Sequence, residues 1–402
     1  MATPVQVQTA SIGFAIPELG KTALCMLAIL VVVAVSFRPG GLLVDDEQYL
    51  FLVKGFFTGR PFENLALGDG SLFLLRPLGY PVLLSIFHPL FGQQWELYPW
   101  TTALFGYGFA VLTWFCLHRR IGHGIALLLT LVLLANPIVR LWTTYVYSDI
   151  PFCFFMMLFF YLNSIPKARD FLPLLAVFLV SLRTAGLPLL GAYAVQLLFQ
   201  KDARRGLILA AAAVPYFAGQ AIAFGQIPGL PDFALVIGNR GAYEPFSWIE
   251  RVMHNFRSLF VSLLPSVFFY GSYGLLQASI LKTLISAVIA LGFVFCLVVM
   301  AGRSVLINLF LLGYFILMLA MRPEDLVHRM LLPLLPLVIL GAGRMAAWGN
   351  SLYMPNLKYA VLALAIASAG DGLLSMDKYR EEFNPRDYSD VYQVGEPALT
   401  EQ

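Results

Sequence analysis

The 402-residue chain is too apolar for a soluble domain: 59% of its residues are hydrophobic and only 12% are charged, against about 25% charged residues in soluble proteins. Its net charge of +3 is small and its basic residues form no stripe, so nothing favours a nucleic-acid partner. The four cysteines lie inside apolar runs without metal-ligand spacing. The composition therefore predicts an all-α, polytopic membrane protein with membrane lipids as partners.

Apolar runs of spanning length, bounded by charges or by Pro and Gly, recur along the chain. They predict about eleven membrane helices (range 10–12), at 22–38, 97–117, 122–139, 150–165, 171–183, 186–199, 207–224, 278–300, 304–320, 330–347 and 358–374. A further apolar stretch, 259–272, is expected to lie flat or to re-enter. Residues 1–374 thus form one transmembrane domain, and 375–402 form a short polar tail.

Charge in alternate loops predicts the orientation, because Lys and Arg are retained on the cytoplasmic side. One side carries Lys and Arg with only Glu18, Asp170 and Asp202 as acids, whereas the other side holds the remaining 20 of the 23 acids. The N-terminus is therefore predicted to be cytoplasmic. The tail and two long segments, 39–96 and 225–277, are predicted to lie outside, so any chemistry is expected on that face.

Acidic residues stand directly after the first apolar run, at Asp45, Asp46 and Glu47, followed by Tyr49. An acid at that depth is costly to ionise without a partner. Solvation of a helix end explains such acids equally well. The functional interpretation is a general base beside a cation site.

Two further outer segments combine charge with rigid backbone. Arg76–Pro81 (RPLGYP) places an arginine before a turn fixed by Pro and Gly, and Ser148–Pro151 (SDIP) places Asp149 at a predicted helix start. Headgroup anchoring by Arg76 and simple helix capping by Asp149 are the alternatives.

These motifs together resemble a known family, the polytopic membrane glycosyltransferases of the C fold (GT-C), which include protein mannosyltransferases and aminoarabinose transferases. Asp45-Asp46-x-x-Tyr49 resembles the family's first-loop acidic motif, and Arg76–Pro81 resembles its Arg-x-Pro-Gly-Tyr-Pro segment. Ser148–Pro151, Ser181–Pro188 and His328–Pro336 resemble later motifs in the same order, although Met330 stands where an aromatic is usual. The resemblance covers residues 20 to about 350.

The resemblance implies an enzyme that moves a sugar from a polyprenyl-phosphate donor to a glycan, lipid or protein acceptor, with inversion. Asp45 is then the candidate general base. Asp46 and Asp149 would orient the acceptor or hold a divalent metal ion, and Tyr49 and Tyr80 are further candidates from the first loop. The implied location is a bacterial inner (plasma) membrane, with the active site on the periplasmic or extracellular side.

The donor's leaving group is a lipid phosphate, so cations at the outer helix ends are candidates to stabilise it. In order of preference these are Arg329, Arg183, Arg322, Arg76 and His328. Arginines at helix ends also reach lipid headgroups whatever the function. Residues 248–257 have the spacing of an amphipathic helix on the outer surface, where interface packing is expected rather than catalysis.

Two other classes of function stay open. A transporter or flippase of lipid-linked saccharides is disfavoured because no internal repeat is visible and the ionisable residues lie in loops and at helix ends. A polymerase or ligase of lipid-linked glycans would use outer arginines and a histidine without an acid pair in the first loop.

Overall fold

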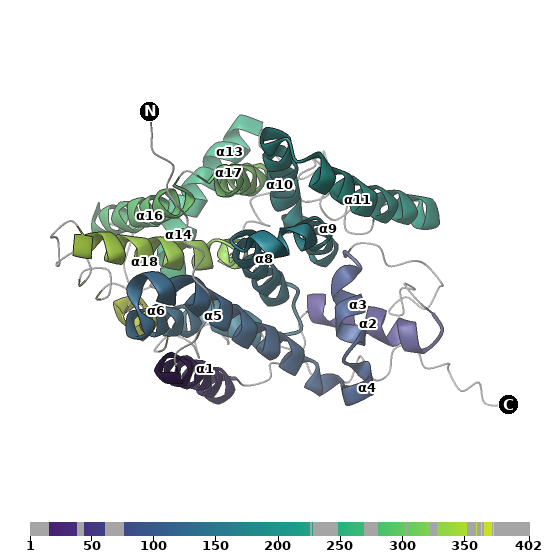
Figure 1. The fold of residues 1–402 in the computed structure, drawn as a ribbon, viewed down its shortest axis with the longest axis horizontal. Coiled ribbons are helices and arrows are strands. Elements are labelled where there is room, and N and C mark those ends of the chain that lie inside the picture. Colours follow the sequence, from purple (N-terminus) through teal and green to yellow (C-terminus); the bar gives the residue numbers. More distant parts are fainter. Residues whose placement is uncertain are drawn as a thin grey trace.

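The computed structural model describes residues 16–37, 44–60, 76–225, 227, 248–268, 280–302, 304–321 and 328–351, with scattered positions between 359 and 373. These described residues form helices and turns and include no strand (Figure 1). The predicted all-α class is confirmed.

In the described N-terminal half, four shorter elements lie between the first long helix and the second. Its elements are α1 (Ile16–Ser36), α2 (Val44–Phe57), α3 (Gly79–Ser85), α4 (His88–Phe91), η1 (Trp95–Leu97), α5 (Pro99–Ile121), α6 (His123–Ala135), α7 (Pro137–Thr143) and α8 (Asp149–Asn163). The segment 39–96, predicted as an outer loop, is therefore largely helical where it is described.

The C-terminal half packs beside α8 and α5. Its elements are η2 (Pro166–Phe171), α9 (Leu172–Leu182), η3 (Thr184–Gly186), α10 (Leu187–Gln200), α11 (Ala203–Phe224), α13 (Trp248–Arg257), the π-helical turn η4 (Ser258–Leu263), α14 (Leu264–Phe268), α16 (Ile280–Ala301), α17 (Val305–Ala320), η6 (His328–Leu331) and α18 (Leu335–Ser351).

Among the described residues, four helical stretches are long and apolar enough to cross a membrane, and a fifth is added if α6 and α7 form one bent span. The helices α8, α17 and Leu335–Ala347 are apolar but shorter. Helices thus occupy most of the predicted ranges, and the number that cross the membrane stays a prediction.

A single helix was predicted over 122–139, but it breaks at Asn136, where α7 turns by 69° from α6. Pro137 is the first residue of α7, and the Asn136 side chain caps it by accepting hydrogen bonds from the backbone N–H groups of Ile138 and Val139. The Asn136 amide also donates to the Val267 carbonyl at 2.8 Å. One side chain therefore ends α6, starts α7 and ties both to α14.

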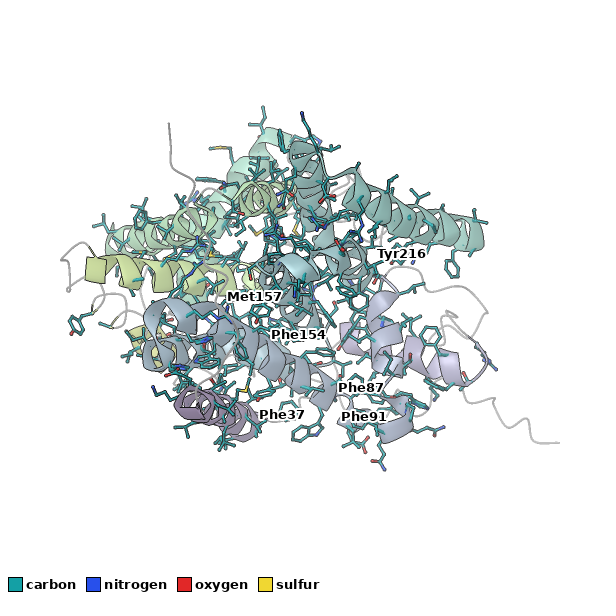
Figure 2. All side chains as sticks on the ribbon, viewed as in Figure 1. Phe37, Phe87, Phe91, Phe154, Met157 and Tyr216 are labelled. Carbon is teal, nitrogen blue, oxygen red and sulfur yellow. The ribbon has the colours of Figure 1, made fainter. Side chains whose placement is uncertain are left out.

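Aromatic rings join the short helices α3 and α4 to the bundle. Phe87, between α3 and α4, contacts Phe105 of α5 at 6.4 Å between ring centroids, and Phe105 contacts Phe154 of α8 at 5.5 Å. Figure 2 shows Phe87 beside the short helices and Phe154 in the centre of the molecule. The segment between α1 and α5 is thus packed against α5 and, through it, α8.

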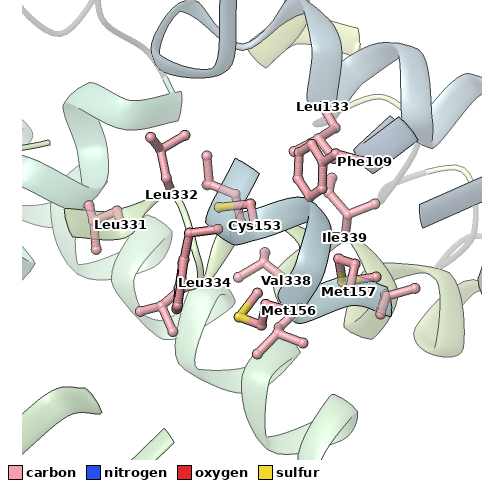
Figure 3. Close-up of a cluster of buried hydrophobic side chains, with 14 of the residues drawn as sticks. Phe109, Leu133, Cys153, Met156, Met157, Leu331, Leu332, Leu334, Val338 and Ile339 are labelled. Carbon is pink, nitrogen blue, oxygen red and sulfur yellow. The ribbon is translucent and has the colours of Figure 1, made fainter. Parts of the chain in front are cut away.

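The residues at the end of η6 and just after it pack into the main buried core. Figure 3 shows Leu331, Leu332 and Leu334 beside Cys153 and Met156 of α8, and all five side chains are buried. Van der Waals contacts between such closely packed side chains stabilise the arrangement. This packing fixes the segment that carries His328 and Arg329 against the helix that begins at Asp149.

The amphipathic helix predicted at 248–257 is present as α13, but two of its polar residues face inward. Arg251 and Asn255 are fully buried, and the Asn255 amide donates to the carbonyls of Leu319 at 3.0 Å and Met321 at 2.6 Å. The last carbonyls of a helix lack partners within it, so Asn255 supplies one at the end of α17. The apolar Ile249 is exposed, as expected for a helix at a membrane interface.

Candidate active site

The first acidic motif lies on a helix and not in a loop. Asp45 and Asp46 belong to the first turn of α2, and their side chains lie outside the described part of the structure. One turn later, the buried Tyr49 hydroxyl shares a 3.1 Å hydrogen bond with the Ser148 hydroxyl. The Tyr49 ring also meets the Tyr80 ring edge-on at 4.8 Å. The helix of the predicted base is thereby held against the start of α8.

The second motif braces α2 from another side. Arg76 Nε donates to the side-chain oxygen of Gln48 at 3.0 Å, and Tyr80 shares a 3.2 Å hydrogen bond with Thr102 of α5. Gly79 lies so close to Ser181 that an added Cβ would stand 2.6 Å from the Ser181 carbonyl. The glycine of this motif is therefore required by close contact with the fourth motif, at the end of α9.

A buried ion pair joins the third and fourth motifs. Arg183, in extended conformation after α9, places Nη1 against the Oδ2 oxygen of Asp149 at the start of α8. The side chains are 14% and 2% exposed, respectively. Arg183 Nη2 also contacts the Met330 sulfur at 3.8 Å. Arg183 thus bridges the acidic position to the fifth motif.

The fifth motif presents a histidine and an arginine on η6. His328 Nε2 shares a 2.7 Å hydrogen bond with the Ser266 hydroxyl of α14. The Arg329 guanidinium lies over two ring faces, at 5.9 Å from Trp142 and 5.6 Å from Tyr147. The Tyr314 hydroxyl donates to the Met330 carbonyl at 2.9 Å. Contacts from α14, α7 and α17 therefore fix this segment.

Five motif segments that are distant in sequence thus meet at one end of the bundle, which we call the motif end. It holds Arg76, Tyr49, Tyr80, Asp149, Arg183, His328 and Arg329. Arg322 lies outside the described residues. Sequence reasoning missed Trp142, Tyr147 and Ser266, because only the break at Asn136 and the turn η4 bring their helices here.

No protein-family model and no curated protein matches the sequence. Among solved structures, ArnT from Cupriavidus metallidurans in the apo state matches with a TM-score of 0.54 and 16% identity, over 90% of this chain and 76% of that one. The same ArnT bound to undecaprenyl phosphate matches with a TM-score of 0.52 and 15% identity, over 89% and 76%.

The chain has the ArnT fold. The architecture implied by the motif resemblance, that of the C-fold aminoarabinose transferases, is therefore confirmed. The likeness extends over nine-tenths of the chain.

Within this ArnT-like framework, an apolar cavity of about 190 Å³ lies between α6, α14, α16 and α18. Leu133, Phe293 and Val338 line it, with Asn136 and Phe268 among its lining residues. Phe268 follows Ser266, the partner of His328, by two residues. One of the helices that line the cavity is therefore α14, whose Ser266 is hydrogen-bonded to His328.

The predicted divalent metal ion would need carboxylate ligands at the motif end. No group of three or more His, Cys, Asp or Glu side chains in the described residues could hold a metal. Asp149 pairs through Oδ2 with Arg183, so part of its charge is already compensated. A divalent metal ion held by Asp46 and Asp149 stays a prediction.

Proposed function

We propose that this chain is an integral membrane glycosyltransferase that transfers a sugar from a polyprenyl-phosphate donor to a glycan, lipid or protein acceptor, with inversion. The motif end would face the non-cytoplasmic side of a bacterial inner membrane. One observation carries the proposal: the resemblance motifs meet at one end of a chain with the ArnT fold. One of the matching ArnT structures has undecaprenyl phosphate bound.

On the acceptor side, Asp45 would act as the base. It would take the proton of the acceptor hydroxyl while that oxygen attacks the anomeric carbon, a role in which a positioned carboxylate contributes about 100- to 10,000-fold. Two hydrogen bonds support this role, because Tyr49 and Gln48 hold α2 against Ser148 and Arg76. A fixed α2 keeps the base at a constant distance from the acceptor.

On the donor side, the bond between the anomeric carbon and the phosphate oxygen breaks, and its electron pair leaves with the polyprenyl phosphate. Charge therefore grows on the phosphate oxygens, where preorganised cations stabilise the transition state. We assign this role first to Arg329, with His328 beside it on η6. Arg76 and Arg322 remain further candidates.

For Asp149 and Arg183 we propose positioning roles. Their mutual ion pair satisfies two charges that would be costly to bury separately. Because Arg183 also contacts Met330, the pair sets the position of η6 relative to the start of α8. It would thereby fix the distance between the donor cations and the acceptor side.

The apolar cavity supports a lipid donor. Its lining includes Asn136, Phe268, Cys296 and Met345 and carries few polar groups. Isoprenoid units would be held in such a cavity by close van der Waals packing, because the surrounding lipid is equally apolar. Because α14 carries both Phe268 of the cavity lining and Ser266, the partner of His328, we propose that the tail would lie near the proposed phosphate site.

The test is sugar transfer by the purified protein in lipid vesicles. Polyprenyl phosphates with labelled hexoses or pentoses would be offered with glycan, lipid and protein acceptor fractions. The proposal predicts labelled product with equal release of polyprenyl phosphate, and a large loss in Arg329→Gln. Movement of intact donor across the vesicle bilayer would instead indicate a transporter, and lengthening of lipid-linked glycan would indicate a polymerase.

A further inference from the structure

The hydroxyl of Ser266 has more polar neighbours than it has protons. Its Oγ lies 2.8 Å from the Ser262 carbonyl, 3.0 Å from the Leu263 carbonyl and 2.7 Å from Nε2 of His328. A hydroxyl carries one proton, and a carbonyl oxygen can only accept. Two oxygens at 2.8 Å without a proton between them would repel each other, so the Ser266 proton lies toward the carbonyls. The Ser266 oxygen is then left as an acceptor for His328.

The turn that takes up this proton is itself held in place. The Ser262 and Leu263 carbonyls belong to the π-helical turn η4, and Ser266 reaches back to them over four and three residues. The Val261 carbonyl of the same turn accepts a hydrogen bond from the Ser286 hydroxyl of α16 at 3.3 Å. Turns of this type are rare inside helices and occur frequently at functional sites.

The helix that carries Ser266, α14, is fixed at its end by side chains from other segments. The Val267 carbonyl accepts a hydrogen bond from the Asn136 amide at 2.8 Å. The next carbonyl, that of Phe268, accepts from the Ser368 hydroxyl at 2.7 Å. The last carbonyls of a helix lack partners within it, so these side chains supply them. Ser266 therefore presents its oxygen from a backbone that is anchored on both sides.

We propose that Ser266 is a positioning residue for His328: it accepts a hydrogen bond from Nε2 and thereby keeps the proton of the neutral imidazole on that nitrogen. The tautomer of a histidine ring is set in this way by the partner of one of its nitrogens. The assignment concerns Nε2 alone and is independent of what Nδ1 contacts. Its consequence for binding rests on the proposed function, because Ser266 would hold the His328 ring beside Arg329, where we expect the lipid phosphate of the donor.

The tautomer is measured by nitrogen NMR of the full chain in lipid bilayers, with isotope-labelled histidine. The chain has five histidines, and the signal that disappears in His328→Leu identifies His328. At a pH where the ring is neutral, the wild type should carry the proton on Nε2. Ser266→Ala removes the acceptor and should give a mixture of both tautomers, whereas Ser266→Thr keeps a hydroxyl and should keep the proton on Nε2. A role of Ser266 in packing alone would leave the tautomer unchanged.

The second measurement is the dissociation constant of undecaprenyl phosphate for the full chain in lipid nanodiscs, with folding compared by thermal unfolding. Ser266→Ala should weaken binding about 2- to 10-fold, the range expected for one lost hydrogen bond, and Ser266→Thr should stay within about twofold of wild type. The matched control is Ser262→Ala, because Ser262 is an exposed serine one turn earlier and the substitution preserves its carbonyl. In a His328→Leu background, Ser266→Ala should change affinity by less than about twofold, because the interaction is already lost.

The outcomes are distinguishable. A proton on Nε2 in the wild type, loss of that preference with weaker binding in Ser266→Ala, and rescue of both by Ser266→Thr would support the positioning role. A proton on Nδ1 in the neutral wild type would overturn it. Unchanged affinity in Ser266→Ala, with weakened binding in His328→Leu, would also overturn it and leave the proposed function standing. No binding of undecaprenyl phosphate by a wild type that carries the Nε2 proton would overturn the proposed function instead.

Discussion

The buried pair of Asp149 and Arg183 gives the sharpest stability prediction. In Arg183→Gln the carboxylate of Asp149, only 2% exposed, would lose the guanidinium that compensates it. Removal of one member of such a pair costs about 3–5 kcal/mol, a large part of the roughly 5–15 kcal/mol that stabilises a typical protein. We expect the free energy of unfolding of Arg183→Gln to fall by that amount.

The double variant Asp149→Asn/Arg183→Gln removes both charges and with them the cost of burying an unpaired one. Its free energy of unfolding should lie within about 2 kcal/mol of wild type. The control is Arg204→Gln, because Arg204 is 76% exposed in its 3.1 Å pair with Asp170. A surface pair of this kind contributes about 1 kcal/mol or less.

The assay is reversible unfolding in mixed micelles, with transfer activity measured on the same samples. The double variant should regain stability but not activity, because the link from α8 to Met330 is still missing. If Arg183→Gln loses less than about 1 kcal/mol, or if the double variant loses the sum of the two single losses, the pair is not a coupled buried one and the reasoning fails.

Three more predictions follow from other contacts. Gly79→Ala should lower the free energy of unfolding by about 1–3 kcal/mol, because its Cβ would collide with the Ser181 carbonyl. The control is Gly124→Ala, which has open space around it and should not lower the free energy of unfolding. Asn136→Ala should cost about 2–3 kcal/mol in chemical unfolding by removing the α7 cap and leaving the Val267 carbonyl unpaired; a loss below 1 kcal/mol would contradict this. Burial lowers the pKa of His88 below its ordinary value near 6.5, so the unfolded chain takes up the proton first and stability should fall as the pH drops below about 6.5; His88→Gln should flatten the melting temperature between pH 7.5 and 5.5, and an unchanged slope would refute the assignment.

Much of the fold follows from sequence because membrane helices depend on local apolar runs. The ends of α9, α10 and α11 lie within a few residues of the predicted 171–183, 186–199 and 207–224. The break at Asn136 was not predicted, because an apolar run continues on both sides of Asn136-Pro137, although these two residues are a local signal for a helix start. The sequence predicts a loop for the acids of the first motif, because their helix, α2, has only 14 residues and is too short to be read as a membrane span. Its contact with Ser148 through Tyr49 is visible only in the structure.

The site was only partly predictable. The order of motifs indicated which residues should meet, and contacts join Tyr49, Asp149, Arg183 and Arg329 as that order implies. The partners of the arginines could not be predicted from the sequence. Spacing along the chain does not show that Arg183 pairs with Asp149 or that Arg329 lies over aromatic rings. The burial of the polar residue Asn255 on α13 could not be predicted either, because its hydrogen-bond partner is a backbone carbonyl at the end of α17.

The central claim is tested most directly by Asp45→Asn. Transfer of radiolabelled sugar from polyprenyl-phosphate donors would be measured in membranes with equal amounts of folded wild type, Asp45→Asn and, as control, Asp377→Asn in the polar tail. The account predicts that wild type and Asp377→Asn label a product and that Asp45→Asn is at least about 100-fold slower. Equal labelling by Asp45→Asn would contradict it, because Asp45 would then be an ordinary solvating acid and not the base.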